Sequence, residues 1–112
     1  MGKETKKRIN EPSLYILLSL LQNHLSGYAI VREVMKITKG RLEIKTGIMY
    51  PTLKILLNQG YISRVEVEKV ERNKKIYKLT EKGREAIDIE MKRLETITSE
   101  IKEVITDCGD KH

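Results

Sequence analysis

Apolar positions recur at helical spacing over four segments of the chain and alternate with polar positions over another part. The first helical segment opens beside Pro12, which suits a first turn, and Leu14 to Leu21 is apolar on nearly all sides. The second segment follows Ser26, a good N-cap, and ends at Gly40. A helix that is apolar on more than one face must be covered on more than one side. We therefore expect a second subunit to cover part of the first helix.

The third helical segment carries the most informative pattern. It runs from about Thr46 to Gln59, with Thr46 where a cap belongs and Gly60 as the stop. One face packs while the other stays free, because four apolar residues recur at helical spacing: Met49, Leu53, Leu56 and Leu57. Pro51 lacks the amide that a continuous helix would use, which predicts a distorted or tight first turn. A packed face and an open N-terminal end are the requirements of a DNA-reading helix.

A hairpin and a last helix complete the pattern. Residues 61–70 and 75–79 alternate and are joined by residues 71–74, which predicts a two-stranded hairpin with a basic tip. Thr80 caps the last helix. Two sets of residues in that helix have the seven-residue spacing of a short coiled-coil seam: Ile87, Leu94 and Ile101, and Met91, Thr98 and Ile105. The predicted fold is mainly α with a two-stranded β-wing, a winged helix-turn-helix followed by a C-terminal dimerisation helix.

The same pattern divides the 112 residues into four parts. We expect a flexible basic arm over 1–10, a winged helix-turn-helix DNA-binding domain over 11–80, a dimerisation helix over 81–106 and a frayed tail over 107–112. A chain of this length has a thin core, which dimerisation would enlarge.

Charge is distributed unevenly along the chain. Residues 1–84 carry 18 Lys or Arg against 8 Asp or Glu, a net charge of +10, whereas residues 85–112 carry 4 against 8, a net charge of −4. A basic body with an acidic last segment indicates that one part faces a polyanion and the other faces something else. A merely solvated Lys-rich surface is the alternative that charge alone leaves open.

Little in the chain indicates an enzyme. The two histidines, His24 and His112, lie far apart, and the single cysteine is Cys108 near the C-terminus. The sequence has no Gly-rich phosphate loop, no paired Cys/His spacing and no nucleophile elbow. We therefore expect no catalytic residue, no metal site and no cofactor. The single cysteine and the lack of a signal peptide or a membrane-length apolar run predict a cytoplasmic location without membrane contact.

The candidate DNA contacts come from three places. Amides near Thr46 and Gly47 would receive a phosphate, helped by the helix dipole, and Tyr50 and Lys54 would project toward the groove. The alternatives are that Gly47 is only a turn residue, Tyr50 a packing residue, and the basic hairpin tip only solvated. Tyr28 either touches a phosphate or packs against the third helix. The predicted set is Tyr28, Lys45, Thr46, Gly47, Tyr50, Pro51, Lys54, Arg72, Asn73, Lys74 and Lys75.

The apolar stripe of the last helix is predicted to form the contact between subunits, together with the second apolar face of the first helix. The alternative is that the last helix folds back on its own domain. The predicted contact set is Leu14, Leu17, Leu18, Leu21, Ile87, Met91, Leu94, Ile97, Ile101, Val104 and Ile105. The seam around Leu14, Leu18, Met91 and Leu94 is also where an apolar small-molecule effector would bind.

Three motifs in this order resemble the PadR family of bacterial and archaeal transcriptional regulators. They are Gly27-Tyr28, Gly47-x-x-Tyr50-Pro51-x-Leu53 and Leu79-Thr80-x-x-Gly83, and the resemblance covers roughly residues 12–105. It implies a homodimer that binds an inverted-repeat operator in double-stranded DNA and usually represses, in the compact subgroup with a single C-terminal helix. The chain departs from the family pattern at Met49, where Leu is usual, and in a hairpin tip without glycine.

The predicted function is therefore sequence-specific DNA binding by a homodimeric transcriptional regulator, most simply a repressor that a small-molecule inducer releases. A winged-helix module that binds another protein is one alternative. Architectural DNA binding without sequence preference is the other.

Overall fold

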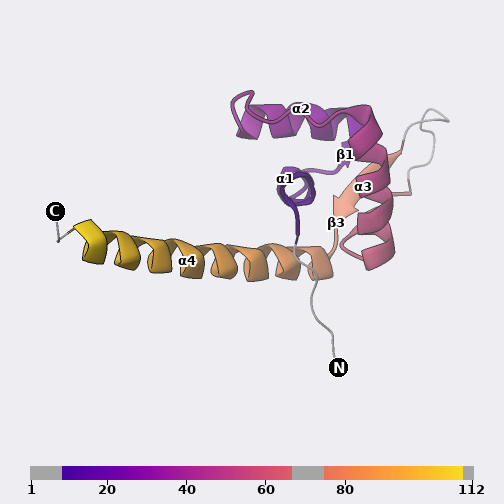
Figure 1. Cartoon of the computed structure of the whole chain (residues 1–112). Coiled ribbons are helices and arrows are strands. Elements are labelled where there is room, and N and C mark those ends of the chain that lie inside the picture. Colours follow the sequence, from indigo (N-terminus) through magenta and orange to yellow (C-terminus); the bar gives the residue numbers. More distant parts are fainter. Residues whose placement is uncertain (1–8, 67–74, 110–112) are drawn as a thin grey trace.

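The structure, a computed structural model, describes residues 9–66 and 75–109. Its elements follow in the order α1 (Glu11–Ser19), β1 (Leu25–Ser26), α2 (Gly27–Ile37), α3 (Thr46–Gln59), β2 (Ile62–Arg64), β3 (Ile76–Leu79) and α4 (Glu81–Gly109). The first three helices and the strands form a body, and α4 extends away from it (Figure 1). The predicted architecture, mainly helical with a β-wing, is confirmed.

Short polar side chains define where three of the helices begin. Asn10, Ser26 and Thr80 cap α1, α2 and α4, and each accepts a hydrogen bond from the backbone amide three residues further on, at 3.0, 3.2 and 3.0 Å. Each cap satisfies an amide that has no partner inside its helix. The sequence predicted the caps at Ser26 and Thr80.

The bounds of α3 are those predicted, and Gly60 ends it in the left-handed conformation with φ of 80°. Two details differ from the prediction. Thr46 is the first helical residue and not the cap, because the extended residue before the helix is Lys45. Pro51 lies inside an unbroken α-helix. Its missing amide removes only the bond to the Gly47 carbonyl, one turn back, and leaves the first turn regular.

The strands form an antiparallel sheet in the order β1-β3-β2. Ser63 of β2 pairs with Lys78 of β3, which confirms the predicted hairpin pairing. β1 pairs Leu25 with Tyr77 and adds a third strand that the sequence did not predict. Two residues are too few to show an alternating pattern. This strand joins the start of α2 to the base of the wing.

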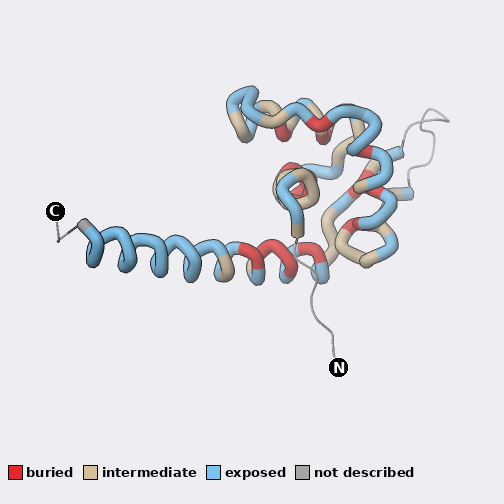
Figure 2. Tube along the Cα trace, in the orientation of Figure 1, coloured by how far each residue is buried: buried red, intermediate tan, exposed pale blue. Residues whose placement is uncertain are grey.

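The hydrophobic core fills the space between the three body helices, the sheet and the first turns of α4 (Figure 2). Its buried members are Ile16, Leu17, Leu20, Ile30, Val34, Ile44, Met49, Leu53, Leu56, Ile62, Tyr77 and Ile87. Leu17 and Ile87 were predicted at the subunit contact, but both are buried within the single chain. They therefore stabilise the body and are not available to a second subunit.

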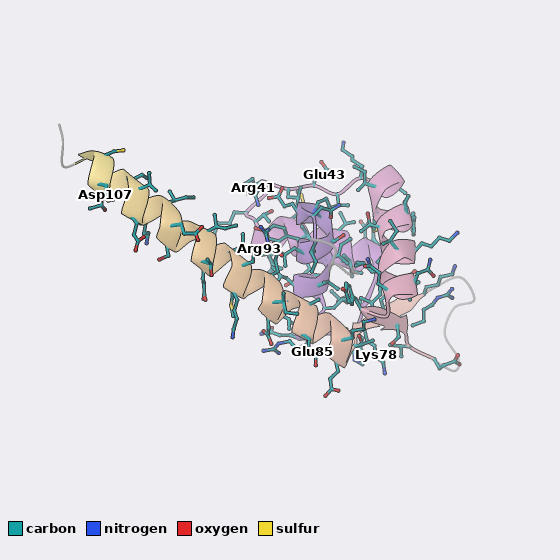
Figure 3. The ribbon with its side chains drawn as sticks, turned by 60° about the horizontal axis from the view of Figure 1, so that its bottom comes forward. Arg41, Glu43, Lys78, Glu85, Arg93 and Asp107 are labelled. Carbon is teal, nitrogen blue, oxygen red and sulfur yellow. The ribbon has the colours of Figure 1, made fainter. Side chains whose placement is uncertain are left out.

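The last helix leaves the body after Arg93, which is labelled in Figure 3. The guanidinium of Arg93 donates to the carboxylate of Glu90 at 2.6 Å. Residues 94–108 are exposed, so α4 does not fold back on its own domain (Figure 2). The helix continues to Gly109, and residues 107–109, predicted to be frayed, are helical. In the described parts of the chain, no helix has both the length and the apolar character needed to cross a membrane.

Candidate nucleic-acid interface

The outward side of α3 is the centre of the candidate interface. Met49 and Leu53 point into the core, whereas Tyr50 and Lys54 are exposed and lie one turn apart. More than half of the Tyr50 surface is accessible, so this ring does not serve as a packing residue. The helix is therefore held by one face and presents the other to solvent, as the spacing of its apolar residues predicted.

The N-terminal end of α3 is open to an anion. The amides of Ile48 and Met49 both donate to the Lys45 carbonyl, at 2.9 and 2.8 Å. The amides of Thr46 and Gly47 lie at the start of the helix, where a backbone amide has no acceptor within the helix. No side chain caps this end, and α3 contains no carboxylate. The positive end of the helix dipole is thus neither covered nor neutralised by the helix itself.

Gly47 is a helical residue with no structural reason to be glycine. A Cβ built on it would meet no atom within 4 Å, and its φ is not in the left-handed region. At Gly83, by contrast, a Cβ would collide with the carbonyl oxygen of Tyr61. Glycine inside a helix costs about 0.5–1 kcal/mol relative to alanine. The close approach of another molecule is a physical reason to bear that cost at Gly47.

The start of α2 lies against α3 and exposes a second aromatic ring. A Cβ on Gly27 would come within 3.2 Å of the Met49 side chain, so these two helices are in close contact. Tyr28 is 72% exposed and does not pack against α3. The guanidinium of Arg32 lies 5.7 Å from the centre of its ring. Arg32 was not predicted as a site residue, although it follows Tyr28 by four residues and the helical spacing places the two side chains on the same face of α2.

The wing places further cations beside α3. Lys75 is exposed just before β3, and Arg64 is exposed at the end of β2. Burial raises the pKa of Tyr77, the charge of Arg64 lowers it, and Tyr50 raises it, so Tyr77 links α3 electrostatically to the base of the wing. Arg64 was not predicted as a site residue, although it falls on the polar side of its strand.

The remaining predicted positions lie beside the start of α3 or outside the described residues. Lys45 and Pro51 are exposed beside the start of α3, and the Lys45 ammonium lies 4.0 Å from the Glu43 carboxylate. The predicted tip residues Arg72, Asn73 and Lys74 lie outside the described residues. Within the described ranges, no group of three or more His, Cys, Asp or Glu side chains could hold a metal ion.

The sequence of the body, the wing and the first turns of α4 matches a known family. The model of the Transcriptional regulator PadR-like family matches residues 16–89. The chain belongs to this family. Family membership confirms the predicted resemblance and places the chain among transcriptional regulators, not enzymes.

A curated relative and several solved structures agree with this assignment. The transcriptional regulator YqjI of Escherichia coli (strain K12) is 30% identical over 92 residues. The match covers 82% of this PadR-family chain and 43% of the relative, so the chain spans less than half the length of that protein. The crystal structure of Bacillus subtilis PadR in complex with operator DNA has a TM-score of 0.59 at 28% identity, covering 69% of this chain and 44% of the other.

Two further structures support the fold. A transcriptional regulator from Clostridium thermocellum has a TM-score of 0.71 at 23% identity and covers 81% of this chain and 89% of its own. A PadR family regulator from Clostridium difficile R20291 has a TM-score of 0.68 at 20% identity and covers 83% and 96%. At these identities the likeness shows the winged-helix fold alone.

Proposed function

We propose that this PadR-family regulator is a homodimeric, sequence-specific DNA-binding repressor that acts on an inverted-repeat operator. The observation that carries the proposal is the open start of α3. This end of α3 has backbone amides without an acceptor in the helix, and a glycine, Gly47, that packing does not require. Tyr50 and Lys54 are exposed on the same helix, which contains no carboxylate. The similarity to Bacillus subtilis PadR, whose structure was determined in complex with operator DNA, supports double-stranded DNA as the partner.

In the proposed complex α3 enters the major groove by its N-terminal end. The amides of Thr46 and Gly47 receive a backbone phosphate, while the Tyr50 hydroxyl and the Lys54 ammonium face the groove. Tyr28 and Arg32 contact the phosphates beside this site, and the wing follows the flanking backbone. These contacts fix the register of α3 on the duplex.

The second copy of the chain is proposed to pack along α4. The exposed apolar residues that supply the contact are Leu21, Met91, Leu94, Ile97, Ile101, Val104 and Ile105, with the half-buried Leu14 and Leu18 beside them. A seam with seven-residue spacing is the pattern by which two helices cover each other in water. A two-fold symmetric dimer presents two copies of α3, which require two inverted half-sites.

A small-molecule inducer is proposed to bind at the same seam. A shallow hollow of about 360 Å³ on α4 is lined by Met91, Leu94, Glu95, Thr98, Ser99 and Lys102. A second subunit would cover this hollow. A small molecule with an apolar surface bound there would change the angle between the two winged helices and spoil the spacing of the two copies of α3.

Selection of bound duplexes from a random pool tests the proposal. We expect the enriched duplexes to share an inverted repeat, and sedimentation to find two protein chains per duplex. Enriched duplexes without a repeat would contradict the dimeric repressor.

Retention on calf-thymus DNA as a function of salt separates the alternatives: weak retention with little salt dependence would favour the protein-interaction module. Equal affinity for every duplex would indicate an architectural binder.

A further inference from the structure

An apolar strip lies exposed on α3 beside the proposed reading residues. Ile48 is 51% exposed and Ile55 is 53% exposed, with the exposed Pro51 between them. Spacings of three and four residues place these side chains on one side of the helix. A single exposed apolar residue needs no explanation by itself, but Ile48 lies in the first turn of the helix proposed to enter the major groove, where base contacts are made.

The first turns of α3 offer few hydrogen-bonding groups to a base edge. Residues 46–54 contain no Arg, Asn, Gln, Asp or Glu, so Lys54 is the one side chain over these turns that can form paired hydrogen bonds with a base. The polar side chains exposed over these turns are those of Thr46, Tyr50 and Lys54. Recognition by this helix must therefore depend on apolar contact as well as on hydrogen bonds.

The chemistry of the major groove limits what an apolar side chain can read. The 5-methyl group of thymine is the apolar group that an ordinary base pair presents there. Residues at the N-terminal end of a recognition helix contact base edges, and Ile48 lies in the first turn of α3. We propose that Ile48 is a specificity-determining residue that contacts the 5-methyl group of one thymine in each operator half-site. This inference rests on the proposed function.

Ile55 provides a matched control on the same helix. It has the same side chain and nearly the same exposed fraction as Ile48, but lies seven residues further on, about 10 Å along the helix axis. It also lines a hollow of about 230 Å³ together with Ile9, Asn10 and Ser13, so it faces the start of α1. We therefore assign the thymine contact to Ile48 and not to Ile55.

The test uses the full-length protein and the duplex enriched from the random pool. Each thymine is replaced in turn by deoxyuridine, which removes the methyl group and keeps every hydrogen-bonding group. We expect one replacement per half-site to weaken binding about fourfold, the effect of one buried methyl group. The Ile48→Ala variant should bind the thymine and uracil duplexes equally, whereas Ile55→Ala should keep the fourfold difference. The Ile48→Ala variant is measured at lower salt, where DNA binding is stronger, so that its reduced affinity can still be determined.

Four results would overturn the inference. Wild-type protein that is indifferent to every methyl group would exclude a thymine contact while leaving the proposed DNA binding intact. A methyl dependence that persists in Ile48→Ala, or that disappears in Ile55→Ala, would show that another residue makes the contact. A pool that yields no enriched duplex would overturn the proposed function, and this inference with it.

Discussion

Gly47 and Gly83 are both helical glycines, yet the structure needs only one of them. A Cβ at Gly83 would collide with the Tyr61 carbonyl oxygen, while a Cβ at Gly47 would enter open space. Each glycine belongs to one of the sequence motifs, and the motifs do not distinguish their roles. Only the packed structure separates a glycine that permits folding from one left for a partner.

Gly47→Ala should raise the free energy of unfolding in urea by about 0.5–1 kcal/mol, because alanine loses less conformational freedom in a helix. It should also weaken operator binding, because the new methyl group holds the phosphate away from the amides. Gly83→Ala is the contrast and should lower stability. A Gly47→Ala protein that binds the operator as tightly as wild type would show that close approach at this residue is not required.

Tyr50 and Lys54 are predicted to act through DNA and not through the fold. The double variant Tyr50→Ala, Lys54→Ala should lose operator binding in fluorescence anisotropy, because both side chains are exposed on the groove side of α3. Its dimer should persist in sedimentation. Asn58→Ala, exposed one turn beyond Lys54, serves as control and should bind nearly as wild type. Undiminished binding by the double variant would refute the choice of reading helix.

At the scale of elements, long periodic segments were predictable and short ones were not. The spacing of Met49, Leu53 and Leu56 and the stop at Gly60 gave the bounds of α3. β1 has two residues and exists only because β3 lies beside it, so no local pattern could reveal it. The burial of Leu17 and Ile87 also required the structure, because a seam residue and a core residue have the same apolar side chain.

The exposed part of α4 gives a prediction about assembly. Ile101 and Ile89 are 52% and 53% exposed, but only Ile101 belongs to the seven-residue seam, whereas Ile89 lies outside its register. Ile101→Lys should place two charges in the dimer contact and convert the protein to monomers in sedimentation equilibrium. Ile89→Lys should remain dimeric. Dissociation by both variants, or by neither, would argue against the seam.

For the molecule as a whole, the charge division separates two tasks. The body is basic and carries the candidate DNA contacts, while α4 beyond Arg93 has exposed apolar and acidic side chains. An acidic projecting helix does not compete for phosphates, and an apolar seam is little affected by salt. DNA binding and dimerisation should therefore respond differently to ionic strength.

Raising the salt concentration from 50 to 200 mM should weaken operator binding about a thousandfold. This estimate follows from about six phosphate contacts per dimer, which Arg32, Arg64 and Lys75 would supply twice. The protein should remain dimeric over the same range. A salt-independent affinity in anisotropy titrations, with the dimer intact, would show that phosphate contacts do not dominate.

The central claim is that two copies of α3 enter successive major grooves of one duplex. Hydroxyl-radical footprinting on the enriched duplex tests it most directly, because the protected sugars mark where each subunit lies. We predict two symmetric protected patches whose centres are about one helical turn apart, on the order of 10 base pairs. A single protected patch, or patches without two-fold symmetry, would contradict the claim.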